Sequence, residues 1–194
     1  MIHFKSISVL LLLFVFSVGQ SQAKYNATPS SENFILIEGT SNIHDWEILA
    51  KNFTSQIDLS VTEGELKKVN SMDLSIPVKG FDSGKSKMDK NTYEALNEDE
   101  YKQVSFTSSI PVQLVETSTG VYKAMVQGEL TISGTTKTVE IPVEFYKTNA
   151  GFTLKAAQGL DMKNYGIEPP TALFGTITTG DTVNIIFNLT HYKS

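Results

Sequence analysis

The chain has 194 residues, no cysteine and a formal net charge of −5, and all 16 of its basic residues are lysine. Without cysteine the chain can form neither a disulfide nor the acylated cysteine of a lipoprotein, so packing alone must hold the fold together. The net acidity argues against nucleic acid as a partner, because phosphate contacts dominate that affinity. The absence of arginine excludes a bidentate guanidinium clamp on a phosphate or carboxylate.

The first 23 residues have the pattern of a secretory signal peptide. Lys5 supplies a positive charge, residues 7–18 are apolar apart from two serines, and Ser21-Gln22-Ala23 offers small residues at the usual cleavage spacing. The apolar run is shorter than the roughly 20 residues of a membrane span, although an uncleaved N-terminal anchor is the alternative. We expect a signal peptide over residues 1–23, one domain over residues 24–194, and a periplasmic or secreted protein.

Most of the remaining chain is predicted to be β-strand, because apolar and polar residues alternate over many short stretches. The clearest case is residues 121–145, where two alternating runs flank Ser133-Gly134 and predict a hairpin with one apolar and one polar face. Further strands are expected at residues 34–38, 43–50, 53–61, 72–78, 104–114, 152–156 and 183–189. Eight or nine strands in mostly sequential order indicate an antiparallel meander, either a barrel or a sandwich.

The tripeptide Ile-Pro-Val occurs around Pro77, Pro111 and Pro142. Proline cannot donate to a strand ladder, so we expect the strands to bend or leave their pairing at these points. Chance recurrence is the alternative explanation.

One amphipathic helix is expected after Ser86, which forms a weak capping-box pattern with Asp89. A single apolar face of this helix would cover one end of the sheet, and it consists of Met88, Thr92, Ala95 and Leu96. The long segment 161–181 follows later and has little strand pattern, which predicts either a packed surface loop or a flap over a cavity mouth.

Catalytic and metal-binding patterns are not found in the sequence. After the signal only His44 and His191 remain, and the adjacent pair His44-Asp45 would point to opposite faces of a strand. No nucleophile elbow, metal-type histidine spacing or phosphate-binding glycine loop occurs. We therefore expect no enzyme, metal site or cofactor, and a structural or mouth position for His44.

Four stretches in order resemble the YceI-like family of exported, polyisoprenoid-binding, lipocalin-like barrels. They are the hairpin Gly128–Val139, the segment Ser41–Trp46, the run from Met88 through Leu96 to Tyr101 and Val104–Ser108, and Asn164–Ile167. The resemblance covers residues 34–191. Gln103 replaces a frequent proline of the family and Asn97 replaces a frequent arginine, so an isoprenoid diphosphate fits this chain less well than a generic apolar tail.

The resemblance implies an all-β fold, an eight-stranded antiparallel lipocalin-like barrel with one short amphipathic helix. Such a barrel is just wide enough to be filled by side chains or to hold a ligand. Inward candidates, each a core residue that would also line a cavity, are Trp46, Phe53, Met72, Leu74, Ile76, Phe106, Ile110, Ala124, Val126, Gly128, Leu130, Phe145, Phe152, Ile185 and Phe187. The small residues Ala124 and Gly128 are where a guest chain is expected to approach the wall.

The function implied is an exported carrier or sequestering protein for a long apolar ligand, such as a polyisoprenoid, an isoprenoid quinone or a fatty-acid derivative, with transient membrane contact. An anionic head group would meet lysines near the helix and late loop, namely Lys79, Lys85, Lys87 and Lys163. One alternative is a solid-core barrel acting through protein contacts as an envelope-stress or assembly factor. Another is a carbohydrate-binding sandwich, for which only Tyr146 and Tyr192 are candidate exposed aromatics. The oligomeric state is not predicted.

Overall fold

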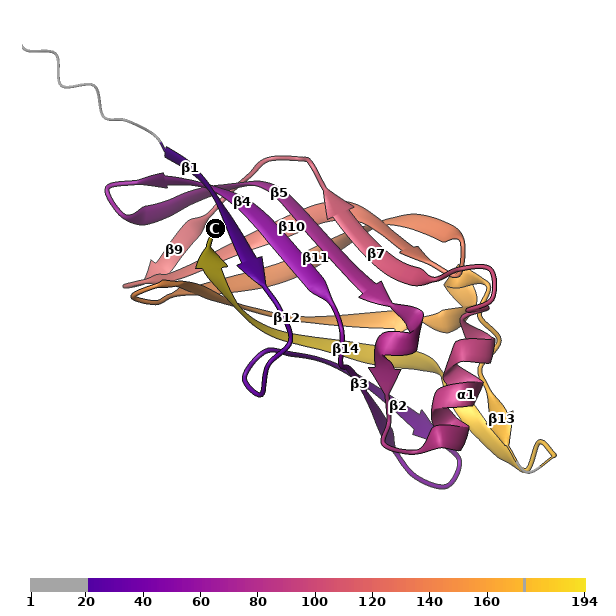
Figure 1. The fold of residues 1–194 in the computed structure, drawn as a ribbon. Helices are drawn as coiled ribbons and strands as arrows, with labels where there is room; N and C mark the ends of the chain where they lie inside the picture. The colour runs from indigo at the N-terminus through magenta and orange to yellow at the C-terminus, as the bar shows by residue number, and fades with distance from the viewer. Residues whose placement is uncertain (1–20, 173) are drawn as a thin grey trace, which may run out of the picture.

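The computed structural model describes residues 21–172 and 174–194, which form a closed eight-stranded antiparallel barrel with a helix across one end (Figure 1). The helix is α1 (Ser86–Ala95), and two short 3-10 helices are η1 (Val78–Gly80) and η2 (Met162–Tyr165). The strands are β1 (Ser21–Ala27), β2 (Phe34–Ser41), β3 (Trp46–Ala50), β4 (Thr54–Thr62), β5 (Glu65–Pro77), β6 (Phe81–Asp82), β7 (Gln103–Ser108), β8 (Val112–Gln113), β9 (Val115–Ser118), β10 (Val121–Ile132), β11 (Thr135–Lys147), β12 (Gly151–Asp161), β13 (Thr171–Ala172) and β14 (Ile177–Lys193). The barrel prediction is confirmed, and the sandwich alternative is wrong.

The barrel wall runs in the order β1-β4-β5-β7-β10-β11-β12-β14 and closes where β1 pairs with the end of β14, through Tyr25↔Lys193 and Asn26↔Tyr192. Toward the helical end, β2, β3 and β6 continue the wall, because β14 pairs with β2, β2 with β3 and β3 with β6. The closing strand β1 was not predicted. The predicted cleavage point after Ala23 falls inside it, and residues 1–20 of the predicted signal peptide lie outside the described residues.

The predicted hairpin is confirmed. Strands β10 and β11 pair from Val121↔Tyr146 to Ile132↔Thr135. Ser133 and Gly134 form the turn with φ values of 46° and 74°. Two consecutive left-handed residues match the twist of the flanking strands, as in a type I′ turn.

The three Ile-Pro-Val repeats differ in their positions. Pro77 ends β5, and Pro111 separates β7 from β8. Pro142 lies within β11, directly before Val143, where the pairing of β11 with β12 begins. Each proline thus stands where pairing on one side stops, as its missing N–H requires. The predicted strand 104–114 is consequently broken after β7, and Ile110 is 52% exposed, so its inward assignment is wrong.

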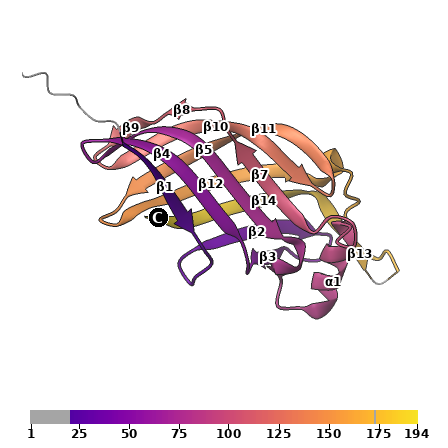
Figure 2. The same ribbon diagram turned by 45° about the horizontal axis from the view of Figure 1, so that its top comes forward.

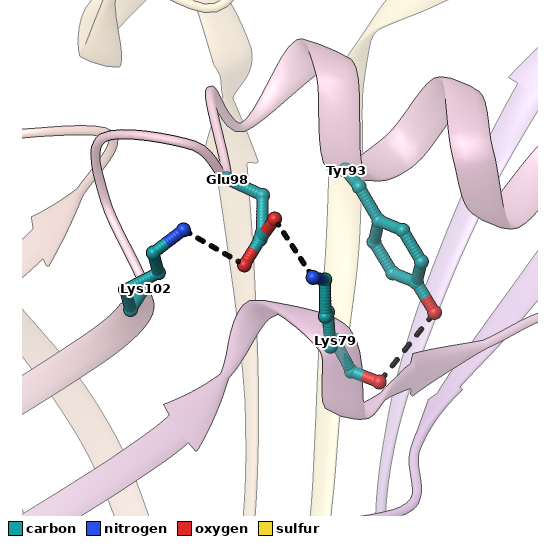
Figure 3. A network of polar contacts seen from close by, with 4 residues as sticks. All are labelled: Lys79, Tyr93, Glu98 and Lys102. Atoms are coloured by element: carbon teal, nitrogen blue, oxygen red, sulfur yellow. Dashed lines mark hydrogen bonds and ion pairs between the residues drawn. The ribbon is translucent and has the colours of Figure 1, made fainter.

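Polar contacts anchor α1 and the turn that follows it to the barrel (Figure 3). The Glu98 carboxylate forms ion pairs with two lysines. The N···O distance is 3.3 Å to Lys79 and 3.2 Å to Lys102. Tyr93 donates from its hydroxyl to the carbonyl of Phe81 at 2.8 Å. These contacts tie the helical segment to β6, to η1 and to the start of β7.

The start of α1 differs from the prediction. The residue preceding the helix is Lys85, and it makes no side-chain cap. Asp89 accepts hydrogen bonds from the backbone N–H of Ser83 at 2.8 Å and from its hydroxyl at 2.6 Å. Ser86 as the capping residue is therefore wrong, because the upstream loop already occupies the Asp89 carboxylate.

The barrel interior away from α1 is closed by a cluster of rings, which we call the aromatic cluster: Tyr25, Phe145, Phe152 and His191. The Phe152 ring centre lies 5.1 Å from that of Tyr25, 5.2 Å from that of Phe145 and 5.0 Å from that of His191. Burying one large apolar side chain contributes roughly 1.5–3 kcal/mol, so this cluster stabilises the barrel and seals it. Figure 2 shows the helical end, with α1 and β13, opposite the end that carries β9. Among the described residues, no helix is long and apolar enough to cross a bilayer.

Candidate ligand-binding cavity

A cavity of about 420 Å³ lies inside the barrel between α1 and the aromatic cluster. Its wall is apolar because the inward residues of the strands are aliphatic or aromatic, and β2, β5, β12 and β14 supply many of them. The volume falls within the range of small-molecule sites, about 300–1,000 Å³. The barrel is therefore not filled by its own side chains.

The mouth of the cavity lies beneath α1. The helix presents the predicted face to the cavity, since Met88, Thr92, Ala95 and Leu96 all line it. The rest of the rim comes from the β2–β3 turn, including His44, and from residues 170–172 before β14. Segment 161–181 thus contributes to the cavity mouth, which agrees with the prediction of a flap rather than a packed surface loop.

The two rim loops are tied together by Asn42. Its side-chain amide donates to the Thr176 carbonyl at 2.9 Å and its Oδ1 accepts from the Thr178 N–H at 3.1 Å. Trp46 supports the same rim: its indole donates to the Thr40 carbonyl at 2.9 Å, and its ring lies over Gly39, where a Cβ would come within 2.0 Å of the ring.

The predicted inward residues divide into three groups. Those that line the cavity are Trp46, Met72, Leu74, Ile76, Phe106, Leu130, Ile185 and Phe187. Phe53, Val126, Phe145 and Phe152 are buried in the packed core and do not line it. Ile110 lies on the surface, and Ala124 and Gly128 are also outside the lining.

The surroundings of Gly128 contradict the expectation that small inward residues leave room for a ligand chain. A Cβ at Gly128 would lie 2.5 Å from Cζ of Phe106 and 2.7 Å from the Thr107 carbonyl oxygen. The glycine is therefore needed so that the Phe106 ring can pack on the β10 backbone. Ala124 pairs with Val143 and likewise is not among the residues that line the cavity.

Further lining residues were not singled out from the sequence. They include Ile35, Ile37, Ile48, Leu154, Leu160 and Leu189, which follow the same period-two alternation and were accessible to that reasoning. Met162 and Ile167 lie in and after η2, where no periodic signal marks them.

A buried polar pair was also missed. The Ser55 hydroxyl lies 2.9 Å from Nε2 of His191, and Nδ1 of His191 lies 3.1 Å from the Leu189 carbonyl oxygen. Ser55 lines the cavity, and His191 belongs to the aromatic cluster. Burial lowers the pKa of His191 to about 4, so the ring is neutral at pH 7. The sequence did carry a signal for this pair, since Ser55 and His191 are polar residues on strand faces that are otherwise apolar.

The four lysines considered for an anionic head group have different surroundings. Lys79 pairs with Glu98, and Lys163 pairs with Asp181 at 2.7 Å. Lys85 and Lys87 are exposed on the rim and line the cavity mouth. Within residues 21–172 and 174–194 neither of these two forms an ion pair.

A second hollow lies at the opposite end of the barrel, and mostly polar residues of β5, β9, β11 and the neighbouring turns line it. Glu65 there accepts a hydrogen bond from Lys147 at 2.7 Å and another from Tyr122. The hydrogen bond from Lys147, followed by that from Tyr122, holds the pKa of Glu65 below its usual value. The described part of the chain contains no group of three or more His, Asp or Glu residues that could hold a metal ion.

The fold and cavity define a lipocalin-like barrel with an apolar interior site. The sequence matches the model of the YceI-like domain over residues 30–191, so the chain belongs to the YceI-like family. A comparison with curated protein sequences gives no match.

Solved structures share the fold at low identity. BcnA of Burkholderia cenocepacia has 21% identity and a TM-score of 0.65, with 82% of this chain and 96% of that chain covered. A polyisoprenoid binding domain from Saccharophagus degradans, implicated in plant cell wall breakdown, has 10% identity and a TM-score of 0.66, with 87% and 98% covered. The YCEI protein of Campylobacter jejuni has 14% identity and a TM-score of 0.56, with 99% and 94% covered.

Proposed function

We propose that this protein is an exported carrier or sequestering protein that holds the apolar chain of a lipid inside the barrel. The observation that carries the proposal is the apolar cavity of about 420 Å³, open beneath α1 and closed by the aromatic cluster. The YceI-like family and the polyisoprenoid-binding relative support an isoprenoid tail as the ligand, with an acyl tail as the chemical equivalent.

The energetics of such a carrier follow from the cavity volume. A liquid water molecule occupies about 30 Å³, and a CH₂ group is of similar size, so the cavity has room for on the order of ten CH₂ groups. At about 0.8 kcal/mol each, their transfer from water contributes roughly 8 kcal/mol. The ordering of a flexible chain cancels a large part of this gain. Binding therefore needs no strong polar contact, and selectivity depends on the length and width of the tail.

The mouth is suited to exchange with a membrane. Ile43 lines the mouth and is 57% exposed, and Phe174, on the turn between β13 and β14, is fully exposed. Lys85 and Lys87 stand beside the same opening. An anionic lipid surface would meet these two lysines while the ligand enters. The Ile43→Ser variant should sediment less with vesicles containing phosphatidylglycerol than the wild type does, whereas the surface variant Val115→Ser should sediment as the wild type does.

The proposed function involves no catalytic step. Ser55 and His191 are in hydrogen-bond contact, but an imidazole with a pKa of about 4 is too weak a base to activate a serine hydroxyl at neutral pH. Binding alone agrees with the character of the family.

The decisive experiment is organic extraction of protein purified from its native envelope, followed by mass spectrometry. We expect a stoichiometric lipid with a long apolar tail. Recovery of lipid-free protein that also takes up no polyprenol, quinone or fatty amide would refute the carrier proposal. Export is tested separately, by cell fractionation and by the mass of the mature chain, which should begin at Lys24.

A further inference from the structure

Ser55 is unusual among the cavity-lining residues. Among those that the structure describes, it is both polar and buried, whereas the other polar ones are partly or fully exposed on and just before α1, at the end of β2 and in the β2–β3 turn, on β12, on β13 and at the start of β14. It lies on β4, paired with Ala27 on one side and Leu74 on the other. Its contact with His191 of the aromatic cluster places it at the inner end of the cavity.

The hydrogen-bond roles in this pair are determined by its surroundings. The Leu189 carbonyl can only accept, so Nδ1 of His191 carries the ring hydrogen and donates to it at 3.1 Å. Nε2 is then an acceptor and receives the Ser55 O–H at 2.9 Å. The hydroxyl hydrogen of Ser55 is thus committed, and its oxygen lone pairs remain able to accept a hydrogen bond from inside the cavity.

We propose that the inner end of the cavity binds a ligand hydroxyl, which donates to Oγ of Ser55, so that a long-chain alcohol is held with its hydroxyl inward. This inference rests on the proposed function and narrows its ligand class. A carboxylate or phosphate at this depth would be a buried charge without a partner, which is costly. A ketone, quinone or ether oxygen would find no donor, because Ser55 can donate to it only by leaving Nε2 of the fully buried His191 unpaired.

The test compares farnesol with its methyl ether, which has a methyl group in place of the hydroxyl hydrogen, for binding to the delipidated full-length protein. We expect the wild type to bind farnesol roughly two- to tenfold more tightly than the ether, the range expected for one hydrogen bond. Ser55→Ala should bring this ratio close to one while the ether still binds. His191→Phe should also lower the ratio, because it frees the Ser55 hydrogen to donate to the ether oxygen. If the Ser55–His191 pair served only to stabilise the fold, neither substitution would alter the ratio of the two affinities.

A second variant keeps the inference testable if Ser55→Ala is unstable, because that change leaves Nε2 without a donor. Ser55→Ala combined with His191→Phe removes both polar atoms and should likewise give a ratio near one. A wild-type ratio near one, with both ligands bound, overturns the hydroxyl site but leaves the carrier function intact. A ratio that persists in the double variant overturns the site as well. Failure of the wild type to bind either ligand overturns the hydroxyl site, and the extraction experiment then decides the carrier proposal.

Discussion

The replacement Ala156→Phe tests whether the cavity is the ligand site. Ala156 lies on β12, pairs with Val143 and Phe187 on the neighbouring strands, and lines the cavity together with both. The new ring adds six carbon atoms to a space that holds on the order of ten CH₂ groups. A tail that gives up about four of its CH₂ groups loses roughly 3 kcal/mol, at 0.8 kcal/mol each. We therefore expect affinity to fall by about 100-fold.

The assay is titration of delipidated protein with a fluorescent dansyl-labelled undecanoic acid, followed by its displacement with farnesol. Ala157→Phe is the matched control, because Ala157 is the next residue on β12 and is exposed on the outer face. The control should bind as the wild type does. Ala156→Phe should change the free energy of unfolding in urea by less than about 1 kcal/mol, because the ring fills existing space and displaces no packed neighbour.

Two results would refute the reasoning. Equal binding by the wild type, Ala156→Phe and Ala157→Phe, with all three folded, would show that the ligand lies outside the cavity. A loss of several kcal/mol in the unfolding free energy of Ala156→Phe would show that the interior is filled around Ala156, as in the solid-core alternative.

Three further predictions concern stability and placement. Gly128→Ala should lower the urea midpoint, by about 1–3 kcal/mol in unfolding free energy, because its Cβ meets the Phe106 ring at 2.5 Å; an unchanged midpoint would contradict this packing. His191 has a pKa of about 4 when folded and 6.5 as its ordinary value, so the unfolded chain binds more protons between these values. The unfolding free energy should therefore fall by about 3 kcal/mol as the pH drops from 6.5 to 4, and His191→Phe should show a flatter profile; parallel profiles for the two proteins would argue against a buried neutral ring. Ile110→Ser should leave ligand affinity unchanged and stability within about 0.5 kcal/mol, because the residue is on the surface, and a marked loss of either would restore its inward assignment.

The sequence by itself determined the strands and the faces they present. Alternation with period two predicted the β10–β11 hairpin, its Ser133-Gly134 turn and the inward side of most strands. The helical period of residues 88–96 predicted the face of α1 that lines the cavity. These features depend on neighbours a few residues apart, so they can be recognised locally.

Only the tertiary structure decided which inward residues line the cavity and which seal it. Alternation assigns a residue to a face but not to a height along the barrel, because that height depends on the register between strands far apart in the sequence. Phe152 therefore lies in the aromatic cluster, while Phe187, which is equally inward, lines the cavity. The space expected beside Gly128 is taken by Phe106 from another strand. Ser55 and His191, 136 residues apart, meet only because β1 closes the barrel between β4 and β14.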